Sequence, residues 1–232
     1  MSLISSGCAS KTSSNNLIGT STEIYDPIEP LNRFVFEFNN VVEVIVISPA
    51  SSIYAAVFPD IVRDSVRNFL RNLETPVTLA NDIFQGEHLR ARDTSMRFLI
   101  NTTAGVLGFF DVAAYLDFKY HHEDFGQTLA IHGIGQGPYL VLPLLGPSSL
   151  RHTVGRVTDI FLSPMTYVND IESINYGLKS IKIIDGHSRI MDTLSDLKRD
   201  SLDYYSLIRS VYSQRRKSVI FNENKNLEKK SK

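Results

Sequence analysis

A run of 26 residues without Asp, Glu, Lys or Arg, from Phe125 to Leu150, most constrains the fold of this 232-residue chain. A run of this length could cross a bilayer as a helix. However, its glycines at 126, 133, 135, 137 and 146 lower helix propensity, and its prolines at 138, 143 and 147 remove backbone donors. Non-helical backbone at membrane depth is tolerated only where it is buried in protein or lines a cavity. We therefore expect an irregular segment here rather than a transmembrane helix.

The overall composition indicates a compact globular fold. Hydrophobic residues make up 43% of the chain and charged residues 21%, and a chain of this length buries most of its apolar surface without disulfides or metal ions. Lys and Arg number 24 against 25 Asp and Glu, so the chain lacks the basic excess typical of nucleic-acid-binding proteins. We expect no nucleic-acid partner.

Cys8 is the single cysteine, which excludes an intramolecular disulfide and a cysteine-based zinc site. Its small-residue setting is similar to the end of a bacterial lipoprotein signal peptide, but the cationic start and the long apolar core of such a signal are missing. A chance cysteine at a frayed terminus and a reading frame that begins upstream both fit. We expect residues 1–8 to be a remnant of the signal and the Ser/Thr/Asn-rich residues 9–24 to be a flexible tether.

Apolar residues at helical spacing predict an α-helical chain after this tether. Thr75-Pro76 is expected to end one helix, and the uncharged residues 44–59 are too short and too interrupted at Pro49 to span a membrane. No clear alternating strand pattern is present. We expect helices over about 28–46, 61–75, 76–85 and 87–104, and two further amphipathic helices around 171–181 and 202–212.

The C-terminal segment is basic, with seven Lys or Arg against two acids between Arg215 and Lys232. Charge runs of this kind are usually solvated, so we expect residues 217–232 to form a disordered basic tail. Attraction to anionic lipid headgroups or to an acidic partner is the alternative.

The sequence contains none of the common catalytic motifs: no Gly-x-Ser-x-Gly elbow, P-loop, His-Glu-x-x-His helix or Rossmann fingerprint. His121-His122-Glu123-Asp124 is the one cluster of candidate metal ligands along the sequence, but adjacent side chains on a regular element point in divergent directions. We therefore expect a non-enzymatic protein with no metal site and no cofactor.

A series of short motifs runs in order from residue 25 to residue 216. They are Tyr25-Asp26-Pro27, Leu31-Asn32-Arg33, Phe38-Asn39, Asn68-Phe69, Asn72-Leu73, Gln85-Gly86, Arg97-Phe98, Asn101-Thr102, Gly108-Phe109-Phe110-Asp111, Glu123-Asp124-Phe125-Gly126-Gln127, Gly133-x-Gly135-x-Gly137-Pro138-Tyr139, Leu142-Pro143, Gly146-Pro147, Leu150-Arg151, Pro164 and Tyr212-x-Gln214-Arg215. Together these motifs resemble the MlaA (VacJ) family of outer-membrane lipoproteins.

The resemblance implies an all-α fold over residues 25–216: a single ring-like bundle of amphipathic helices with an irregular Gly/Pro-rich loop, embedded in one membrane leaflet. It implies a phospholipid-transport channel that removes mislocalised phospholipid from the outer leaflet of the outer membrane and passes it to a periplasmic carrier of the MlaC type. A trimeric porin is the implied partner. Lipid anchoring at Cys8 in the periplasmic leaflet is also implied, although Ser5 stands where the family normally has a leucine-like residue.

Two sets of residues follow from this comparison. We expect one set to form the lipid channel or its gate, with glycines at 133, 135 and 137 allowing close backbone approach and unusual dihedral angles: Phe125, Gly126, Gly133, Gly135, Gly137, Pro138, Tyr139, Leu140, Pro143, Gly146 and Pro147. We expect the other set to be structural: Asp26, Pro27, Asn32, Arg33, Asn72, Gln85, Gly86, Arg97 and Asn101.

Two other functions remain open on the sequence. The first is a structural or virulence-linked adaptor of the envelope that contacts proteins and transports nothing. The second is a lipid hydrolase, which would release lysophospholipid and depend on a serine or histidine. Lipid bound to the purified protein would favour the channel over both.

Overall fold

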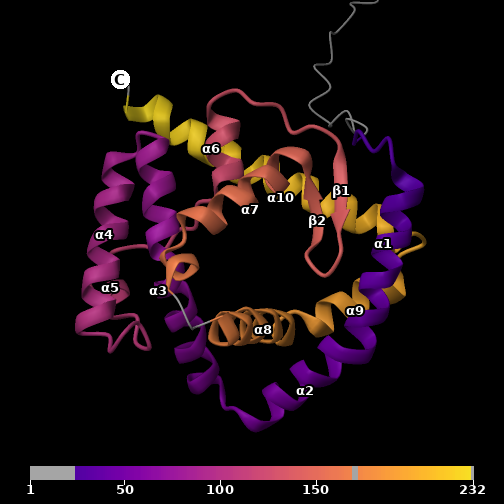
Figure 1. Ribbon diagram of the computed structural model, residues 1–232, viewed down its shortest axis with the longest axis horizontal. Coiled ribbons are helices and arrows are strands. Elements are labelled where there is room, and N and C mark those ends of the chain that lie inside the picture. The colour runs from indigo at the N-terminus through magenta and orange to yellow at the C-terminus, as the bar shows by residue number, and fades with distance from the viewer. Residues whose placement is uncertain (1–23, 169–171, 231–232) are drawn as a thin grey trace, which may run out of the picture.

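The computed structural model describes residues 24–168 and 172–230, which form a ring of helices around a central opening (Figure 1). Its elements are α1 (Glu29–Val42), a π-helical turn (Glu43–Ile47), α2 (Ser48–Val57), α3 (Asp60–Phe84), α4 (His88–Thr103), α5 (Val112–Tyr115), α6 (Phe125–Ile131), β1 (Tyr139–Leu142), β2 (Gly146–Ser149), α7 (Leu150–Leu162), a 3₁₀ turn (Pro164–Tyr167), α8 (Glu172–Ser188), α9 (Met191–Asp200) and α10 (Tyr204–Lys230). The ring-like, mostly helical fold is confirmed.

The first helical segment runs without a break from Glu29 to Val57, past the end that we predicted near residue 46 and past the interruption that we predicted at Pro49. A proline in a regular helix clashes with the carbonyl four residues before it. Here the π-helical turn precedes Pro49, and the Ser48 N–H donates to the Glu43 carbonyl five residues back. This local widening of the helix accommodates the proline. In the described part of the chain, this is the one helix long and apolar enough to cross a membrane, and 6% of its most apolar window is buried.

Helix α3 also continues through a proline, so the predicted division into two helices at Thr75-Pro76 is wrong. Pro76 costs the helix one backbone hydrogen bond, on the order of 3 kcal/mol in an interior position. The helix persists because both halves bury the same face: Leu70 lies before the proline, and Thr78 and Asn81 lie after it. By contrast, α4 matches the predicted helix over 87–104 closely.

The basic C-terminal segment was predicted to be disordered, but the structure continues α10 as far as Lys230. Lys and Glu are good helix formers, and elongation of an existing helix adds a hydrogen bond for each residue that is fixed. The packed first half of α10 supplies that existing helix, since Tyr205 and Ser213 are buried.

A short hairpin interrupts the ring, contrary to our expectation of no strands. Strand β1 pairs with β2 in antiparallel register, with Tyr139 opposite Ser149 and Leu142 opposite Gly146. The turn between them places Leu144 and Gly146 at φ angles of 62° and 72°, the left-handed region that favours glycine. Strands of four residues are too short to establish a period of two against the background of the sequence.

Helix α1 covers the other edge of β1 with two asparagine side chains seven residues apart. The Asn32 amide donates to the Tyr139 carbonyl at 3.0 Å and accepts from the Val141 N–H at 2.9 Å. Asn39 makes the same pair of bonds with the carbonyl of Leu142 and the N–H of Leu144, at 2.9 and 2.8 Å. A helix thus satisfies backbone groups that a third strand would otherwise pair.

Helices α6 and α7 approach each other closely through two glycines. A Cβ atom on Gly155 of α7 would lie 2.3 Å from the backbone nitrogen of Gly126 in α6, so no side chain fits at this crossing. Asp124 and Ser149 cap the two helices by accepting from Gln127 N–H at 2.9 Å and His152 N–H at 3.2 Å.

Candidate functional site

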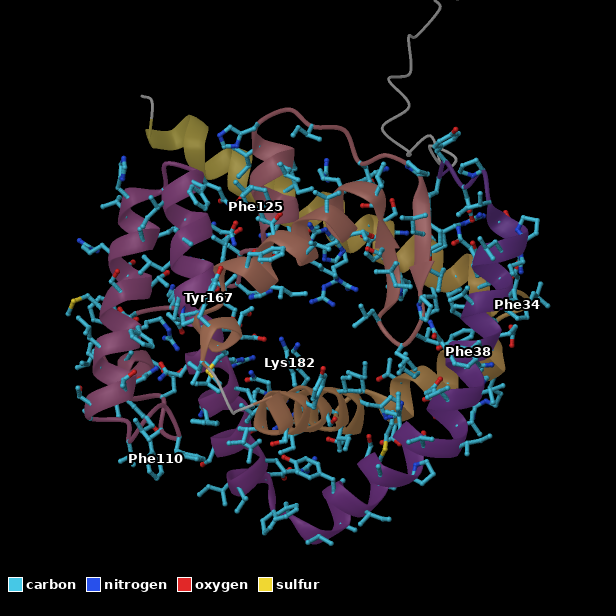
Figure 2. All side chains as sticks on the ribbon, in the orientation of Figure 1. Phe34, Phe38, Phe110, Phe125, Tyr167 and Lys182 are labelled. Carbon is cyan, nitrogen blue, oxygen red and sulfur yellow. The ribbon has the colours of Figure 1, made fainter. Side chains whose placement is uncertain are left out.

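The ring exposes apolar side chains on its outside and directs a cation into its opening. Figure 2 shows Phe34 and Phe110 pointing away from the ring, whereas Lys182, which pairs with Glu74 of α3, points from α8 into the central opening. Phe34 is 74% exposed and Phe110 57%. Other strongly exposed apolar residues include Ile45, Ile53, Val57, Ile61, Leu99, Leu107, Leu145 and Phe161. Large exposed apolar surfaces mark membrane or protein contacts.

The predicted channel residues divide between three settings. Gly133, Gly135 and Gly137 lie in the loop after α6, Leu140 lies in β1, and Pro143, Gly146 and Pro147 lie in the hairpin turn and β2. Gly126 and Tyr139 are instead buried, Tyr139 to 1% exposure, and Phe125 packs edge-to-face with Phe84. Gly126 and Tyr139 therefore contribute to packing of the ring.

The three loop glycines are not equivalent. Gly133 and Gly137 adopt left-handed φ angles of 82° and 69°, as expected for unusual dihedral angles. A Cβ atom on Gly137 would lie 3.0 Å from the Leu150 Cβ, whereas one on Gly133 or Gly135 would meet nothing within 4 Å. A side chain would thus be crowded at Gly137, by Leu150, but not at Gly133 or Gly135.

A polar network closes the ring by joining α1 to α10. The Arg33 guanidinium contacts Asp203 at 2.6 Å and Glu29 at 2.7 Å. Arg209 contacts Asp26 at 2.8 Å, and the Tyr205 hydroxyl donates to the same carboxylate at 2.5 Å. Hydrogen bonds from Arg33 hold the pKa of Asp203 well below its usual range. The predicted structural role of Asp26 and Arg33 is therefore to join segments about 180 residues apart in sequence, while Pro27 lies just before α1.

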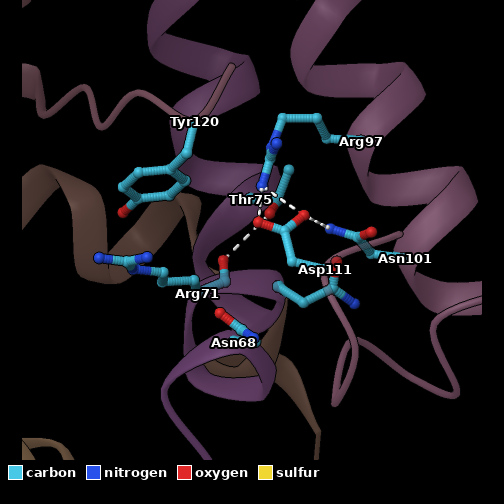
Figure 3. Close-up of a pocket in the computed structure, with 8 residues that line it drawn as sticks. Asn68, Arg71, Thr75, Arg97, Asn101, Asp111 and Tyr120 are labelled. Atoms are coloured by element: carbon cyan, nitrogen blue, oxygen red, sulfur yellow. Dashed lines mark hydrogen bonds and ion pairs between the residues drawn. The ribbon is translucent and has the colours of Figure 1, made fainter. Parts of the chain in front are cut away.

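A second network fixes the apolar loop after α4 (Figure 3). Arg97 Nη2 donates to both carboxylate oxygens of Asp111 at 2.7 and 2.8 Å, and Asn101 donates to Asp111 at 2.9 Å while accepting from Ala113 N–H. Burial raises the pKa of Asp111, but the Arg97 and Asn101 hydrogen bonds outweigh this effect and lower it. Asn72 donates to the Leu107 carbonyl at 3.2 Å. Asn72, Arg97 and Asn101 are thus structural residues.

Gln85 and Gly86 belong to the junction between α3, α4 and α6. Gly86, at a φ of 74°, lies just past the end of α3. Gln85 is buried and donates to Thr128 Oγ1 at 3.0 Å and to Glu123 at 3.3 Å. Glu123 in turn pairs with Arg90 at 2.6 Å.

Two members of the His-His-Glu-Asp run meet a third residue that the sequence did not indicate. One candidate ligand atom each of Asp82, His121 and Glu123 lie within 4.8 Å of one another. Asp82 is fully buried and contacts His121 at 2.9 Å and the Thr94 hydroxyl at 2.6 Å. Both carboxylates already have hydrogen-bond donors or an ion-pair partner within the protein. We therefore assign no metal to this cluster.

His152 of α7 lies beside a buried ion pair between Asp124 and Arg216. The Arg156 Nε–H donates to His152 Nε2 at 3.3 Å, which requires that nitrogen to be unprotonated, and His152 Nδ1 lies 3.0 Å from the Tyr212 hydroxyl. Burial and the charge of Arg216 lower the pKa of His152 to about 4. The imidazole is therefore neutral in the folded protein at neutral pH.

Acidification is expected to destabilise the protein through His152. The unfolded imidazole titrates near 6.5 and the folded one near 4, so the contribution is complete above pH 6.5 and is lost as the pH falls toward 4. We expect a loss on the order of 2 kcal/mol in unfolding free energy between pH 7 and pH 4.5. Denaturant unfolding should show that His152→Gln reduces this dependence, whereas the exposed His88→Gln leaves it unchanged. An equal pH dependence of the unfolding free energy in the wild type and both variants would contradict this role of His152.

Three residues of the ring were absent from the predicted sites. Asn39 could have been found, because it lies seven residues after Asn32 on the same helix face. Asp203 and Lys182 carry no local signal, since their roles depend on partners or positions far away in sequence.

The chain is similar to known proteins over most of its length. The MlaA lipoprotein family model matches residues 24–219. The intermembrane phospholipid transport system lipoprotein MlaA of Escherichia coli is 32% identical over 213 residues, which cover 90% of this chain and 81% of the relative. An uncharacterized protein of Rickettsia prowazekii is 36% identical over 205 residues, covering 87% and 81% of the two chains.

A solved structure, described as the structural basis for maintenance of bacterial outer membrane lipid asymmetry, matches with a TM-score of 0.75 at 30% identity. The match covers 84% of this chain and 98% of the other. The agreement in sequence and in fold extends around the whole ring. This chain belongs to the MlaA lipoprotein family.

Proposed function

We propose that this protein is a phospholipid-transport channel lipoprotein of the outer membrane that removes mislocalised phospholipid from the outer leaflet and so maintains lipid asymmetry. The observation that carries the proposal is the polarity of the ring: apolar side chains such as Phe34 face outward, while Lys182, paired with Glu74, points into the opening. A phospholipid needs a polar path for its headgroup and apolar surroundings for its tails. The names of the E. coli relative and of the matched structure support the same function.

In this proposal the ring lies in the periplasmic leaflet, and the Gly/Pro-rich segment forms part of the channel wall or its gate. The exposed apolar outside would contact lipid, and internal hydrogen bonding satisfies the backbone, as a bilayer requires. The candidate wall and gate residues are Phe125, Gly133, Gly135, Gly137, Pro138, Leu140, Pro143, Gly146 and Pro147. The protein supplies no catalysis and uses no cofactor in this role.

The proposal includes partners and an anchor. A periplasmic carrier of the MlaC type would receive the lipid, and a trimeric porin would hold the ring in the membrane. Cys8, which lies outside the described residues, would be diacylated. Mass spectrometry of the native protein tests this last point, and an unmodified Cys8 would contradict it.

The proposal and the adaptor alternative differ in whether lipid is bound. Lipid mass spectrometry of the detergent-extracted protein should find co-purified phospholipid, and loss of the gene should expose phospholipid on the cell surface. A protein that carries no phospholipid, and whose loss leaves the surface unchanged, would be an adaptor. Release of lysophospholipid would instead indicate a hydrolase.

Substitution at Gly137 should impair transport more than substitution at Gly135. Gly137→Val forces a β-branched residue into a left-handed conformation and against Leu150, at a cost of about 2 kcal/mol. Gly135→Val meets open space at an ordinary φ and serves as the matched control. Complementation of a strain that lacks its own homologue should show surface phospholipid with Gly137→Val only, while thermal unfolding verifies that both variants fold. Full complementation by a folded Gly137→Val protein would show that the loop is not part of the gate.

A further inference from the structure

An apolar cavity of about 270 Å³, open to the surface, lies between α2 and α8, on the side of α8 away from the central opening. It is lined by Ala50, Ile53, Tyr54, Val57, Phe58, Ile181 and Ile184. In Figure 1, α8 lies between α2 and the opening, and Lys182 points from α8 into that opening (Figure 2). The cavity is therefore separate from the channel of the proposed function.

Polar contacts fix the spacing of the two helices and keep the cavity from collapsing. Ser51, fully buried, donates to the Ile184 carbonyl at 3.2 Å, and the Tyr54 hydroxyl donates to Asp185 at 3.4 Å. Asp185 is itself held by Arg189 at 3.0 Å. The apolar walls thus cannot close without breaking these bonds.

The size and lining of the cavity define its ligand. An enclosed apolar void of about 150 Å³ binds benzene, which gives a scale for the volume of this open cavity. A cavity almost twice that volume and without polar walls suits a hydrocarbon chain. Its open mouth includes the exposed lining residues Ile53 and Val57, 65% and 62% exposed, on the helix that is long and apolar enough to cross a membrane. The hydrocarbon that reaches this mouth is that of the bilayer.

We infer that the cavity between α2 and α8 binds one acyl chain of a membrane phospholipid, at a site outside the central opening. This inference takes phospholipid as the ligand class from the proposed function, but it concerns a different place in the fold. A chain held there would fill the void between the two helices and keep a lipid at the outer edge of the ring.

The sequence contains no tryptophan, so a single introduced indole reports on the cavity without background. In detergent, phosphatidylcholine with a brominated acyl chain is added to the Phe58→Trp protein up to an equimolar ratio. The bromine atoms quench the fluorescence of a nearby indole. We expect saturable quenching that unlabelled phosphatidylcholine reverses. Phe34→Trp, on the outer face of α1, reports on non-specific partition and should remain unquenched at this ratio.

Filling the cavity should abolish the signal. Ala50→Phe in the Phe58→Trp background places a ring inside the cavity, while Ala56→Phe, on the exposed side of the same helix, leaves it open. Excluding two methylenes weakens binding roughly fifteenfold, because each contributes about a fourfold change in affinity. Thermal unfolding verifies both variants, and Ile184→Phe fills the cavity from the α8 wall if Ala50→Phe does not fold.

Four results would overturn the inference: no quenching of Phe58→Trp, equal quenching of Phe34→Trp, quenching that survives Ala50→Phe in a folded protein, or quenching that appears only after Cys8→Ser. The last result would mean that an acyl chain attached at Cys8 occupies the cavity. None of them affects the co-purified phospholipid and the surface lipid by which the proposed function is judged, so the two proposals can fail independently.

Discussion

Replacing Asn32 by Leu is expected to lower the unfolding free energy by on the order of 3 kcal/mol. Asn32 is 2% exposed, and its amide donates to the Tyr139 carbonyl and accepts from Val141 N–H. Leucine has a similar volume but leaves both backbone groups unpaired in a buried site. An unsatisfied buried polar group costs about 1 to 3 kcal/mol, whereas a net hydrogen bond contributes about 1 kcal/mol. The loss of pairing, and not the loss of packing, therefore determines the effect.

Denaturant unfolding measures this change, and hydrogen exchange locates it. The Val141 amide should exchange faster in Asn32→Leu, and the Leu144 amide faster in Asn39→Leu, because each asparagine accepts from one of these two N–H groups. Asn40→Leu is the matched control: its amide bonds the side chains of Glu37 and Lys198, so its effect should stay within about 0.5 kcal/mol. An unchanged Val141 exchange rate would show that β1 does not depend on Asn32.

The helices of the ring were largely predictable because their signals are local. The predicted helix over 87–104 matches α4 to within about a residue at each end. The two wrong helix ends share one cause: Pro49 and Pro76 were each expected to break the helix. At Pro49 a π-helical turn accommodates the proline. At Pro76 the burial of one face on both sides of the proline outweighs the lost hydrogen bond.

The candidate site was less predictable because it depends on pairs that are distant in sequence. Asp26 and Asn32 were expected to be structural, but nothing local indicates that Arg209 pairs with Asp26 or that Asn32 bonds the edge of β1. The His121 run likewise needed Asp82, 39 residues away, to form its cluster. The resemblance to a family predicted the ring as a whole, and the individual contacts that close it came only from the structure.

The buried ion pair between Asp124 and Arg216 should produce the largest effect of a single substitution. Arg216 contacts the two carboxylate oxygens of Asp124 at 2.5 and 3.0 Å, and both side chains are 11% exposed. Removing one partner of a buried pair leaves an uncompensated charge and costs about 3 to 5 kcal/mol. Arg216→Met is the cleaner substitution, because it leaves Asp124 in place to cap α6 through Gln127 N–H. Arg215→Met, its exposed neighbour on α10, should change stability by less than about 0.5 kcal/mol.

The pH dependence of the same variants identifies the ion pair as the cause. Burial raises the pKa of Asp124, but the hydrogen bonds and charge of Arg216 outweigh this effect and lower it. The contribution of Asp124 is therefore complete above the ordinary carboxyl pKa of 3.8 and is lost as the pH falls below it. In Arg216→Met the remaining carboxylate is buried without its cation, so acidification through this range should destabilise the variant less than the wild type. Parallel losses in both proteins, or an Arg216→Met cost no larger than that of Arg215→Met, would show that α10 is held to α6 by apolar packing instead.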